Sequence, residues 1–402
     1  MRADEQQASP GFTALAAIDG WVSEHEDDLI ALRRHLHAHP ELGRGEHATT
    51  DLVAQRLTQA GLVPQRLPGT GLWCDIGTGE RVVALRADLD ALPLQDAKNV
   101  PYRSTTAGVC HACGHDAHTA IAVGVALLLA ELNAAGRLPG RVRMIFQPAE
   151  EIMPGGALDA IAAGVLEGVS TILAVHCDPA LDAGLVGLRV GPITAAADRV
   201  EVRLTGPGGH TSRPQNTVDL VYALGRVLTE LPAALTRVVD PRAAMTLVWG
   251  MVSAGTVPNA IPDIGFARGT LRVLDHDAWE QAPKVIDRFT ASIAGVYGAG
   301  VTVDYTRGVP PVVNSAYGIE LLRQATEVAL GPGREVPTPQ SLGGEDFGWY
   351  LEHASGAMAR LGTRVPGGAT HDLHQSSFDI DERALAVGVR LLATAALLGL
   401  AD

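Results

Sequence analysis

The first 190 residues of the chain alternate between two hydrophobic patterns. In one, apolar residues return every three or four positions, which predicts helices over residues 20–38, 49–60 and 116–132. In the other, short unbroken apolar runs predict strands over residues 82–85, 141–146 and 171–175. Strands that alternate with helices favour a mostly parallel sheet covered by helices on both faces.

The pattern changes near Gly191, where short strands with period-two alternation take over. In chain order we predict a strand, a helix, two strands, a helix and a strand, over residues 199–204, 218–231, 244–252, 264–273, 278–294 and 301–305. This βαββαβ order is typical of a small α+β domain. Gly191-Pro192 and Gly308–Pro311 flank it as hinges.

The helix and strand patterns of the first part return over residues 318–330, 356–361 and 382–400. We therefore predict an α/β protein in which one domain is interrupted by another. Residues 1–190 and 307–402 would form a catalytic domain, a mostly parallel sheet with helices on both faces. Residues 191–306 would form a smaller α+β (βαββαβ) lid domain inserted into it.

Composition narrows the classes of partner. The formal net charge of -14 over 402 residues argues against nucleic acid or an anionic membrane surface. Residues 1–10 lack the basic and apolar regions of a secretory signal, and the longest apolar run, residues 120–130, is too short to span a bilayer. Four cysteines are too few for a disulfide framework in a chain of this size, so we expect a cytoplasmic protein with no membrane partner.

Four segments of the chain carry side chains that bind divalent metals. They are Cys113-Gly114-His115, Glu150-Glu151, His176 and His374. Cys113 and His115 lie in a loop that enters a helix, and Glu151 and His176 follow predicted strands. One thiolate, one carboxylate and three imidazoles exceed what a single tetrahedral zinc needs and suit two metals that share a bridging ligand. Glu150 stands beside a ligand, where a hydrolytic centre needs its general base. We expect His111 and Asp116 to orient ligands rather than to bind a metal directly, since ligating imidazoles need hydrogen-bond partners.

Several alternatives stay open on the residues alone. Adjacent glutamates are often only a solvated surface, and spacing does not choose His374 over His371 or His353. Cys110-x-x-Cys113 would suit a dithiol oxidoreductase, which leaves the glutamates and His374 without a role. A third reading is a non-catalytic binding protein on the same fold, which would be expected to lose the base or a ligand.

Nine motifs together resemble a known family of metal-dependent amidohydrolases. The family includes hippurate hydrolases, indole-acetyl-amino-acid hydrolases and N-acyl-amino-acid deacylases, and it is related to aminoacylase and glutamate carboxypeptidase. The resemblance covers nearly the whole chain, and the order of the motifs makes it specific. The motifs are Arg34–Leu42, Arg86–Pro93, Cys113–Asp116, Gln147–Glu151, Val175–His176, Gly208–His210, Gly255–Asn259, Gly343–Phe347 and Leu373–His374.

The resemblance implies a role for each matching residue. The ligands of a two-metal centre would be Cys113, His115, Glu151, His176 and His374, the last chosen by its Leu-His pair. Glu150 would be the acid and base, and Asp88 would steady the centre. His210 would help to hold the substrate carbonyl as it becomes an oxyanion, and Asn259 and Arg272 would face the substrate carboxylate.

The resemblance also implies cofactors and partners. The cofactors would be two divalent metal ions, manganese or zinc, with cobalt or nickel as alternatives. The substrate would be an N-acyl amino acid or a related amide, cleaved to a carboxylic acid and an amine, and the lid domain would offer a homodimer surface. Many relatives have His where this chain has Arg86, and a bridging Asp where it has Cys113, which places it in the Cys/His branch of the family.

Overall fold

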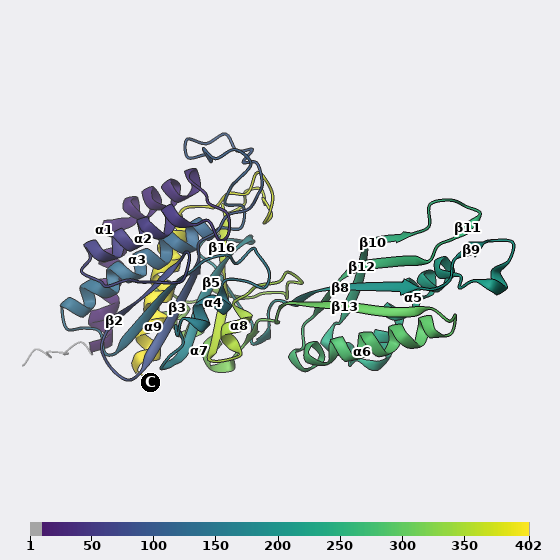
Figure 1. Ribbon diagram of the computed structural model, residues 1–402. Coiled ribbons are helices and arrows are strands. Elements are labelled where there is room, and N and C mark those ends of the chain that lie inside the picture. Colours follow the sequence, from purple (N-terminus) through teal and green to yellow (C-terminus); the bar gives the residue numbers. More distant parts are fainter. Residues whose placement is uncertain (1–9, 402) are drawn as a thin grey trace, which may run out of the picture. The chain divides into compact units, whose positions relative to one another are not determined.

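The computed structural model describes residues 10–401, which form two compact units (Figure 1). The larger unit contains the chain up to Gly191, Val313–Pro339 and the chain from Trp349 on, and the smaller unit contains Pro192–Val312 and Gln340–Gly348. The predicted boundary at residue 306 would cut a strand, β13 (Gly300–Val309), and nothing in the sequence pattern marked the return of residues 340–348 to the smaller unit. The segment in which we looked for a secretory signal lies outside the described residues, except for Pro10.

An eight-stranded sheet of order β1-β2-β4-β3-β5-β16-β6-β15 forms the centre of the larger unit. The strands are β1 (Gln65–Arg66), β2 (Leu72–Gly77), β3 (Val82–Asp88), β4 (Arg141–Gln147), β5 (Val169–Asp182), β6 (Val186–Leu188), β15 (Glu335–Pro337) and β16 (Ser355–Arg364). The central pairs β4–β3, β3–β5 and β5–β16 are parallel, while β1–β2, β2–β4 and β16–β6 are antiparallel. Every residue of β3 is buried, which requires cover on both faces of the sheet. The predicted mostly parallel sheet is confirmed.

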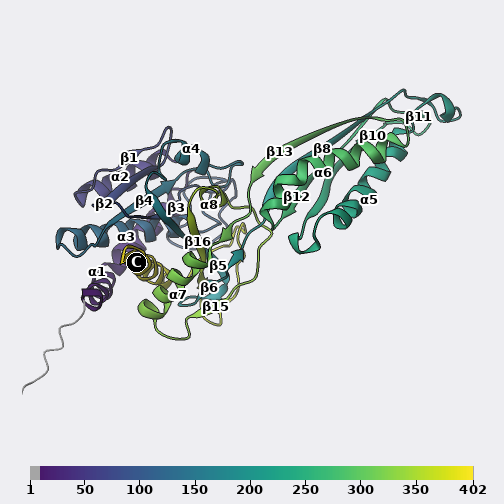
Figure 2. The same ribbon diagram turned by 90° about the horizontal axis from the view of Figure 1, so that it is seen from below.

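Helices of the larger unit pack along this sheet. They are α1 (Pro10–Ala38), α2 (His47–Gln59), α3 (His115–Ala134), α4 (Ala157–Ala162), α7 (Ala316–Leu330), α8 (Gly348–Leu351) and α9 (Arg383–Ala401). Helices α1, α3 and α9 contact one another, and α9 also contacts α7 (Figure 2). Helices α3 and α9 are long and apolar enough to cross a membrane by length and composition alone, but 72% of each such stretch is buried inside the unit. Both contact β3, as core helices do.

Strand β5 is longer than its sequence predicted. The sequence predicted a strand over residues 171–175, but β5 continues to Asp182. Strand β3 pairs with β5 only as far as Ala174, and Pro179 falls where the β5–β16 register shifts, so its missing N–H breaks no ladder hydrogen bond. His176 therefore lies just beyond the last residue that β5 pairs with β3.

The smaller unit is a four-stranded antiparallel sheet of order β10-β12-β8-β13 with two helices on one face (Figure 1). Its main elements are β8 (Ala196–Thr205), α5 (Leu220–Val238), β10 (Thr246–Ala254), β12 (Ile264–Val273), α6 (His276–Gly295) and β13. Its short elements, with those where the chain passes between the units, are β7 (Gly191–Pro192), β9 (Gly209–His210), η1 (Pro214–Asn216), η2 (Pro241–Ala243), β11 (Ala260–Ile261) and β14 (Val313–Asn314). The predicted order of elements is confirmed.

Local chemistry explains where the helices of the smaller unit begin. The Asp219 carboxylate accepts a hydrogen bond of 3.1 Å from the Tyr222 nitrogen at the start of α5, and Asp275 accepts one of 2.8 Å from the Ala278 nitrogen at the start of α6. Such caps satisfy backbone donors that have no partner inside the helix.

Candidate metal centre

The predicted residues of the larger unit gather at the carboxyl ends of its parallel strands. Asp88 ends β3, Glu150 and Glu151 follow β4, and His176 lies on β5. His374 lies in the loop between β16 and α9. Open α/β sheets bind their ligands at this edge.

Five of these side chains form two overlapping groups. The ligand atoms of Cys113, His115 and His176 lie within 4.8 Å of one another, and so do those of Cys113, Glu151 and His374. The Cys113 Sγ atom lies 3.5 Å from Nε2 of His176, and Nε2 of His374 lies 3.2 Å from Oε1 of Glu151. The structure thus brings all five predicted ligands together and makes the Cys113 thiol common to both groups.

The structure also separates His374 from its two competitors. His371 is exposed and its Nδ1 atom lies 3.2 Å from the Ser377 hydroxyl, while His353 is exposed at the end of α8. His374 is therefore the histidine of this region that meets Glu151.

Glu150 lies beside the predicted ligands but belongs to neither of the two groups that contain Cys113. Its carboxylate forms a third group with His115 and Glu151, within 4.8 Å, and its Oε2 atom is 3.9 Å from Nε2 of His115. The side chain is buried. A carboxylate in this place can exchange a proton with a group held at the centre.

Backbone geometry at Gly114 sets the direction of the first two ligands. Gly114 has φ of +90°, and a Cβ atom there would lie 2.7 Å from Sγ of Cys177. Only glycine tolerates both conditions, so the chain can turn sharply between Cys113 and His115 as α3 begins. His374 and Ala149 also have positive φ, +62° and +53°, which is uncommon for residues with a side chain.

Two groups that the sequence did not single out orient the histidine ligands. The carbonyl oxygen of Asp90 accepts a hydrogen bond of 2.9 Å from Nδ1 of His115, and the Asp90 carboxylate accepts one of 2.9 Å from the Glu151 nitrogen. The Nδ1 atom of His176 donates to the carbonyl oxygen of Cys177 at 2.8 Å. In both histidines Nε2 is then the atom with the free lone pair. The only sequence signal for Asp90 was its place two residues after Asp88 in a motif.

Asp88 contacts two residues next to the predicted ligands, His118 and Arg86. It accepts hydrogen bonds from Nδ1 of His118 at 2.6 Å and from Arg86 at 2.5 Å, and it lies 3.7 Å from Nε2 of His115. The Nε2 atom of His118 in turn accepts a hydrogen bond of 2.9 Å from the Cys177 nitrogen. Asp88 and His118 thus connect β3, α3 and β5 behind the ligands, an arrangement suited to the steadying role that the resemblance implies for Asp88.

The other orienting residues that we expected have different contacts. The Asp116 carboxylate accepts hydrogen bonds from Arg33 at 2.8 Å and from Nδ1 of His37 at 2.7 Å. His111 is buried, and neither ring nitrogen has a hydrogen-bond partner among the described residues. Burial lowers the pKa of His111 to about 4. Asp90 performs the orienting role instead.

Burial sets the protonation of two of the ligands, Cys113 and His176, when no cation is present. It raises the pKa of the Cys113 thiol well above its usual value, and the nearby Glu151 and Glu150 carboxylates raise it further. It lowers the pKa of His176 well below its usual value, with a smaller contribution from Arg360. A neutral imidazole is ready to coordinate, whereas a bound cation would have to displace the thiol proton.

The residues fit a two-metal centre. The Nε2 atom of His115 is buried and makes no hydrogen bond within residues 10–401, although it points at the cluster. Sulfur, imidazole nitrogen and carboxylate oxygen are the donors that zinc and related divalent metals take. The Cys113 thiol, which belongs to both donor sets, would be available to both cations.

His210 and Asn259 lie side by side in the smaller unit. Strand β9 pairs with β11, with His210 opposite Ala260, and the Thr211 nitrogen donates a hydrogen bond of 3.2 Å to the Asn259 carbonyl oxygen. The Nδ1 atom of His210 accepts a hydrogen bond of 3.0 Å from the Ser212 nitrogen. The exposed His210 ring therefore carries its proton on Nε2, where it can be donated.

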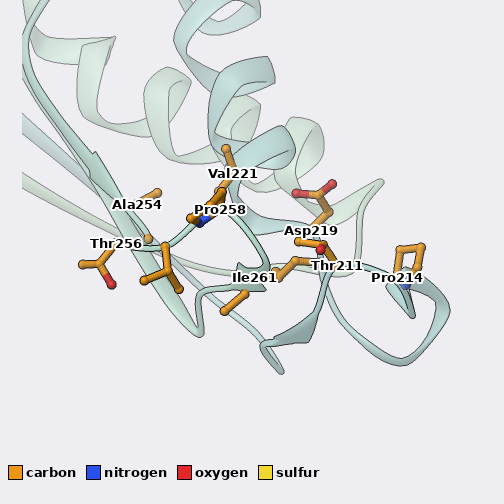
Figure 3. Close-up of a pocket in the computed structure, with 11 residues that line it drawn as sticks. Thr211, Pro214, Asp219, Val221, Ala254, Thr256, Pro258 and Ile261 are labelled. Atoms are coloured by element: carbon orange, nitrogen blue, oxygen red, sulfur yellow. The ribbon is translucent and has the colours of Figure 1, made fainter.

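A pocket of about 520 Å³ opens next to this pair (Figure 3). It is lined by Thr211, Pro214, Asp219, Val221, Ala254, Gly255, Thr256, Val257, Pro258, Ala260 and Ile261. The size is in the range of small-molecule sites. Its lining includes most of the predicted Gly255–Asn259 motif.

Arg272 is not brought to the His210–Asn259 pair. Strand β12 begins at Ile264, three residues after β11, which pairs with the strand of His210. Arg272 lies eight residues farther along β12, which corresponds to about 26 Å of extended strand. Its side chain is half-buried, and its Nη1 atom makes no hydrogen bond in the part of the chain that the structure describes. Burial lowers the pKa of the guanidinium.

Comparison with known protein families identifies the family of this chain. The family described as peptidase family M20/M25/M40 matches residues 84–398. This chain belongs to that family. The family predicted from the sequence is thereby confirmed, and with it the class of enzyme, a metal-dependent amidohydrolase.

Two named proteins are similar to this chain over nearly its whole length. An N-acetyl-L-cysteine deacetylase of Bacillus subtilis is 36% identical over 368 residues, which cover 90% of this chain and 86% of that protein. A protein of Rhodococcus jostii named as a glutamate–cysteine ligase is 47% identical over 378 residues, 92% of this chain but 47% of that longer protein.

A solved structure agrees with both the fold and the metal centre. The crystal structure of a dinuclear metal-binding peptidase of the M20 family from Bacillus subtilis superposes with a TM-score of 0.82, at 34% identity. The match covers 94% of this chain and 99% of that one. Membership of the M20 family and the donor set of this chain together support two divalent metals.

The oxidoreductase alternative finds no support in these relatives. Cys110 is fully buried, and burial raises the pKa of its thiol to about 11. The thiolate is the reactive form of cysteine, so Cys110 is poorly suited to disulfide exchange.

Proposed function

We propose that this M20-family chain hydrolyses the amide bond of N-acyl amino acids or related small amides, using two divalent cations. The observation that carries the proposal is the Cys113 thiol shared by two groups of ligands, with Glu150 beside them. The similarity to an N-acetyl-L-cysteine deacetylase supports the substrate class.

The five ligands would hold the cations in two sets. Cys113, His115 and His176 form one set, and Cys113, Glu151 and His374 form the other. Bound there, the cations would polarise the scissile carbonyl and lower the pKa of the attacking water. The donors suit zinc, and the carboxylate also suits manganese, with cobalt or nickel as alternatives.

Glu150 would move the protons of the reaction. Its carboxylate takes a proton from the attacking water and later delivers it to the leaving nitrogen, so that an acid and an amine are released. A positioned general acid and base of this kind contributes about 10²–10⁴-fold to the rate. The burial of Glu150 and its distance of 3.9 Å from His115 support this role.

Residues of the smaller unit would complete the site. His210 has its donor on Nε2, which suits stabilisation of an oxyanion, and Asn259 lies beside it. We propose that His210 acts either through closure of the smaller unit as a lid or from the second subunit of a homodimer. The cytoplasmic location stays a prediction.

A reconstitution experiment tests the proposal. The protein is stripped with a chelator, reloaded with manganese, zinc, cobalt or nickel, and assayed for amine release from a panel of N-acetyl amino acids. We expect no turnover without metal, turnover after reloading, and two metal ions per chain in the active form. Turnover of the stripped protein equal to that of the loaded protein, or no turnover on any N-acyl amino acid with two metals bound, would contradict it.

A further inference from the structure

Arg33 of helix α1 is completely buried and contacts three carboxylates. Its Nε atom donates to Asp116 at 2.8 Å, its Nη2 atom donates to Asp379 at 2.7 Å, and its Nη1 atom donates to Glu382 at 3.4 Å. A fully buried arginine is rare unless it is paired. Its contacts are charge-assisted, which makes them strong and directional.

The first two carboxylates belong to the segments that carry ligands. Asp116 directly follows His115 at the start of α3, and Asp379 lies five residues after His374 in the loop between β16 and α9. His115 and His374 belong to different ligand sets. A single guanidinium therefore joins the two segments that must be aligned for two sets of ligands to share Cys113.

Two neighbouring side chains donate hydrogen bonds to the same carboxylates, Asp116 and Asp379. The Nδ1 atom of His37, one turn after Arg33 on α1, donates to Asp116 at 2.7 Å. The Tyr102 hydroxyl donates to the second oxygen of Asp379 at 2.8 Å, and the Arg33 guanidinium lies 5.0 Å from the centre of the Tyr102 ring. The motif Arg34–Leu42, which the proposed chemistry did not use, thus begins on the last turns of the helix that contacts both ligand-bearing segments.

The loop that carries His374 depends on such anchors. Residues 365–372 are exposed, the His374 side chain is 54% exposed, and the His374 backbone has positive φ. Packing of its own side chain therefore does little to hold this histidine, although Phe378 of the same segment is buried in the core. Its segment is tied to the rest of the unit by the hydrogen bond from the His374 nitrogen to Ala112, by one of 3.0 Å from the Ala97 nitrogen to Ser376, and by the contacts of Asp379.

We propose that Arg33 and Asp379 are positioning residues that hold His374 in place relative to His115, so that the set of Cys113, Glu151 and His374 binds its cation tightly. This inference rests on the proposed function, because that function assigns the two sets. Neither residue would touch the substrate or a cation. Loosening Asp379 should release one cation much more easily and leave the other in place.

Metal retention measures this directly. Wild-type protein and Asp379→Asn, both loaded with zinc, are dialysed against increasing concentrations of a chelator, and the metal ions per chain are counted. Loss of a group that orients a ligand typically weakens metal binding about 10–100-fold. We expect Asp379→Asn to release one of its two ions at a chelator concentration at least about tenfold lower than wild type, and to keep the second. His374→Ala serves as the reference for the one-ion state.

Arg390→Ala is the matched control. Arg390 of α9 donates to Asp19 of α1 at 2.7 Å, so the change also removes an arginine–carboxylate pair on α1, but among the described residues Arg390 has no ion pair or side-chain hydrogen bond with Asp116, Asp379 or Tyr102. Its release profile should match that of wild type. If Asp379→Asn does not fold by circular dichroism, Tyr102→Phe replaces it, because it removes only one hydrogen bond to Asp379 and should shift the same ion by a smaller amount.

The outcomes separate this inference from the function on which it rests. Wild-type protein that binds fewer than two ions would contradict the proposed function. If wild type binds two ions and the folded Asp379 or Tyr102 variant keeps both with unchanged affinity, or loses both in parallel, the positioning role is wrong.

Discussion

The backbone nitrogen of His374 donates a hydrogen bond of 2.7 Å to the carbonyl oxygen of Ala112. This contact places the last ligand of the chain beside Cys113, the residue after Ala112, although the two lie in distant parts of the sequence. The two ligand sets can share the Cys113 thiol because the loop after β16 returns to the start of α3. The candidate centre is therefore a product of tertiary structure as much as of its motifs.

Replacement of Cys113 should remove metal as well as activity. Because the thiol belongs to both ligand sets, Cys113→Ala should bind fewer than two ions per chain after dialysis and lose activity by on the order of 100-fold or more. Cys110→Ala, in the same segment, is the control and should keep both. Metal analysis together with an amide-hydrolysis assay checks this, and damage by the Cys110 change alone would revive the dithiol interpretation.

Replacement of Asp90 should weaken metal binding, although Asp90 is not itself a predicted ligand. Asp90→Ala removes the carboxylate that accepts from the Glu151 nitrogen, so we expect affinity for metal to fall about 10–100-fold while the fold is retained. Asp75→Ala removes a carboxylate that pairs with Arg143 at 2.7 Å in the same unit and should leave affinity unchanged. Equal affinities of the two variants would show that Asp90 does not orient the centre.

Much of the fold followed from hydrophobic periodicity. Apolar spacing predicted the main helices and the central strands, because each must bury one face or both. Strand pairing is decided by contacts between distant segments, so the extension of β5 to Asp182 and the return of Gln340–Gly348 to the smaller unit left no local signal.

The sequence predicted the candidate metal ligands, whose residue types seldom occur together for structural reasons alone. It did not predict which aspartates contact those ligands, because that depends on the three-dimensional structure. A cysteine, histidines and paired glutamates after strands pointed to a metal, whereas Asp90 resembles many other loop aspartates. Asp116 was expected to orient a ligand because ligating imidazoles need hydrogen-bond partners. Successive residues of a helix point about 100° apart, so Asp116 faces Arg33 of α1 while His115 faces the cluster.

Acid should weaken the fold partly through Asp96. Burial raises the pKa of this carboxyl, but hydrogen bonds from His37, the Ser104 nitrogen and Lys98 outweigh it and bring the pKa below its usual value. A carboxyl whose pKa is lowered by folding stabilises the protein above its unfolded pKa of about 3.9, and this stability is lost as the pH falls towards the folded value.

Asp96→Asn should therefore unfold more easily near neutral pH, by about 2 kcal/mol. The difference from wild type should shrink below about pH 4, because the Asp96 carboxyl of the unfolded wild-type chain becomes protonated there while that of the folded chain stays ionised. Urea unfolding of both metal-free proteins between pH 7 and pH 3.5 checks this. A difference that stays constant over that range would show that the charge of Asp96 does not stabilise the fold.

His210→Ala should lower kcat by on the order of 100-fold with metal content unchanged, since it removes a donor to the oxyanion and no ligand. Mixing His210→Ala with Glu150→Gln then distinguishes two arrangements. Recovered activity would mean that His210 acts across a homodimer, and no recovery would favour closure within one chain. A variant with the kcat of wild type would leave the smaller unit without a catalytic role.

The most direct test of the whole account is the activity of Glu150→Gln protein that has been shown to contain two metal ions. Our account assigns Glu150 the transfer of protons and gives the metals to its neighbours. It predicts that this variant binds both ions, unfolds at the temperature of wild type, and hydrolyses an N-acetyl amino acid at least about 10²-fold more slowly. Hydrolysis at the wild-type rate by the two-metal variant would contradict it.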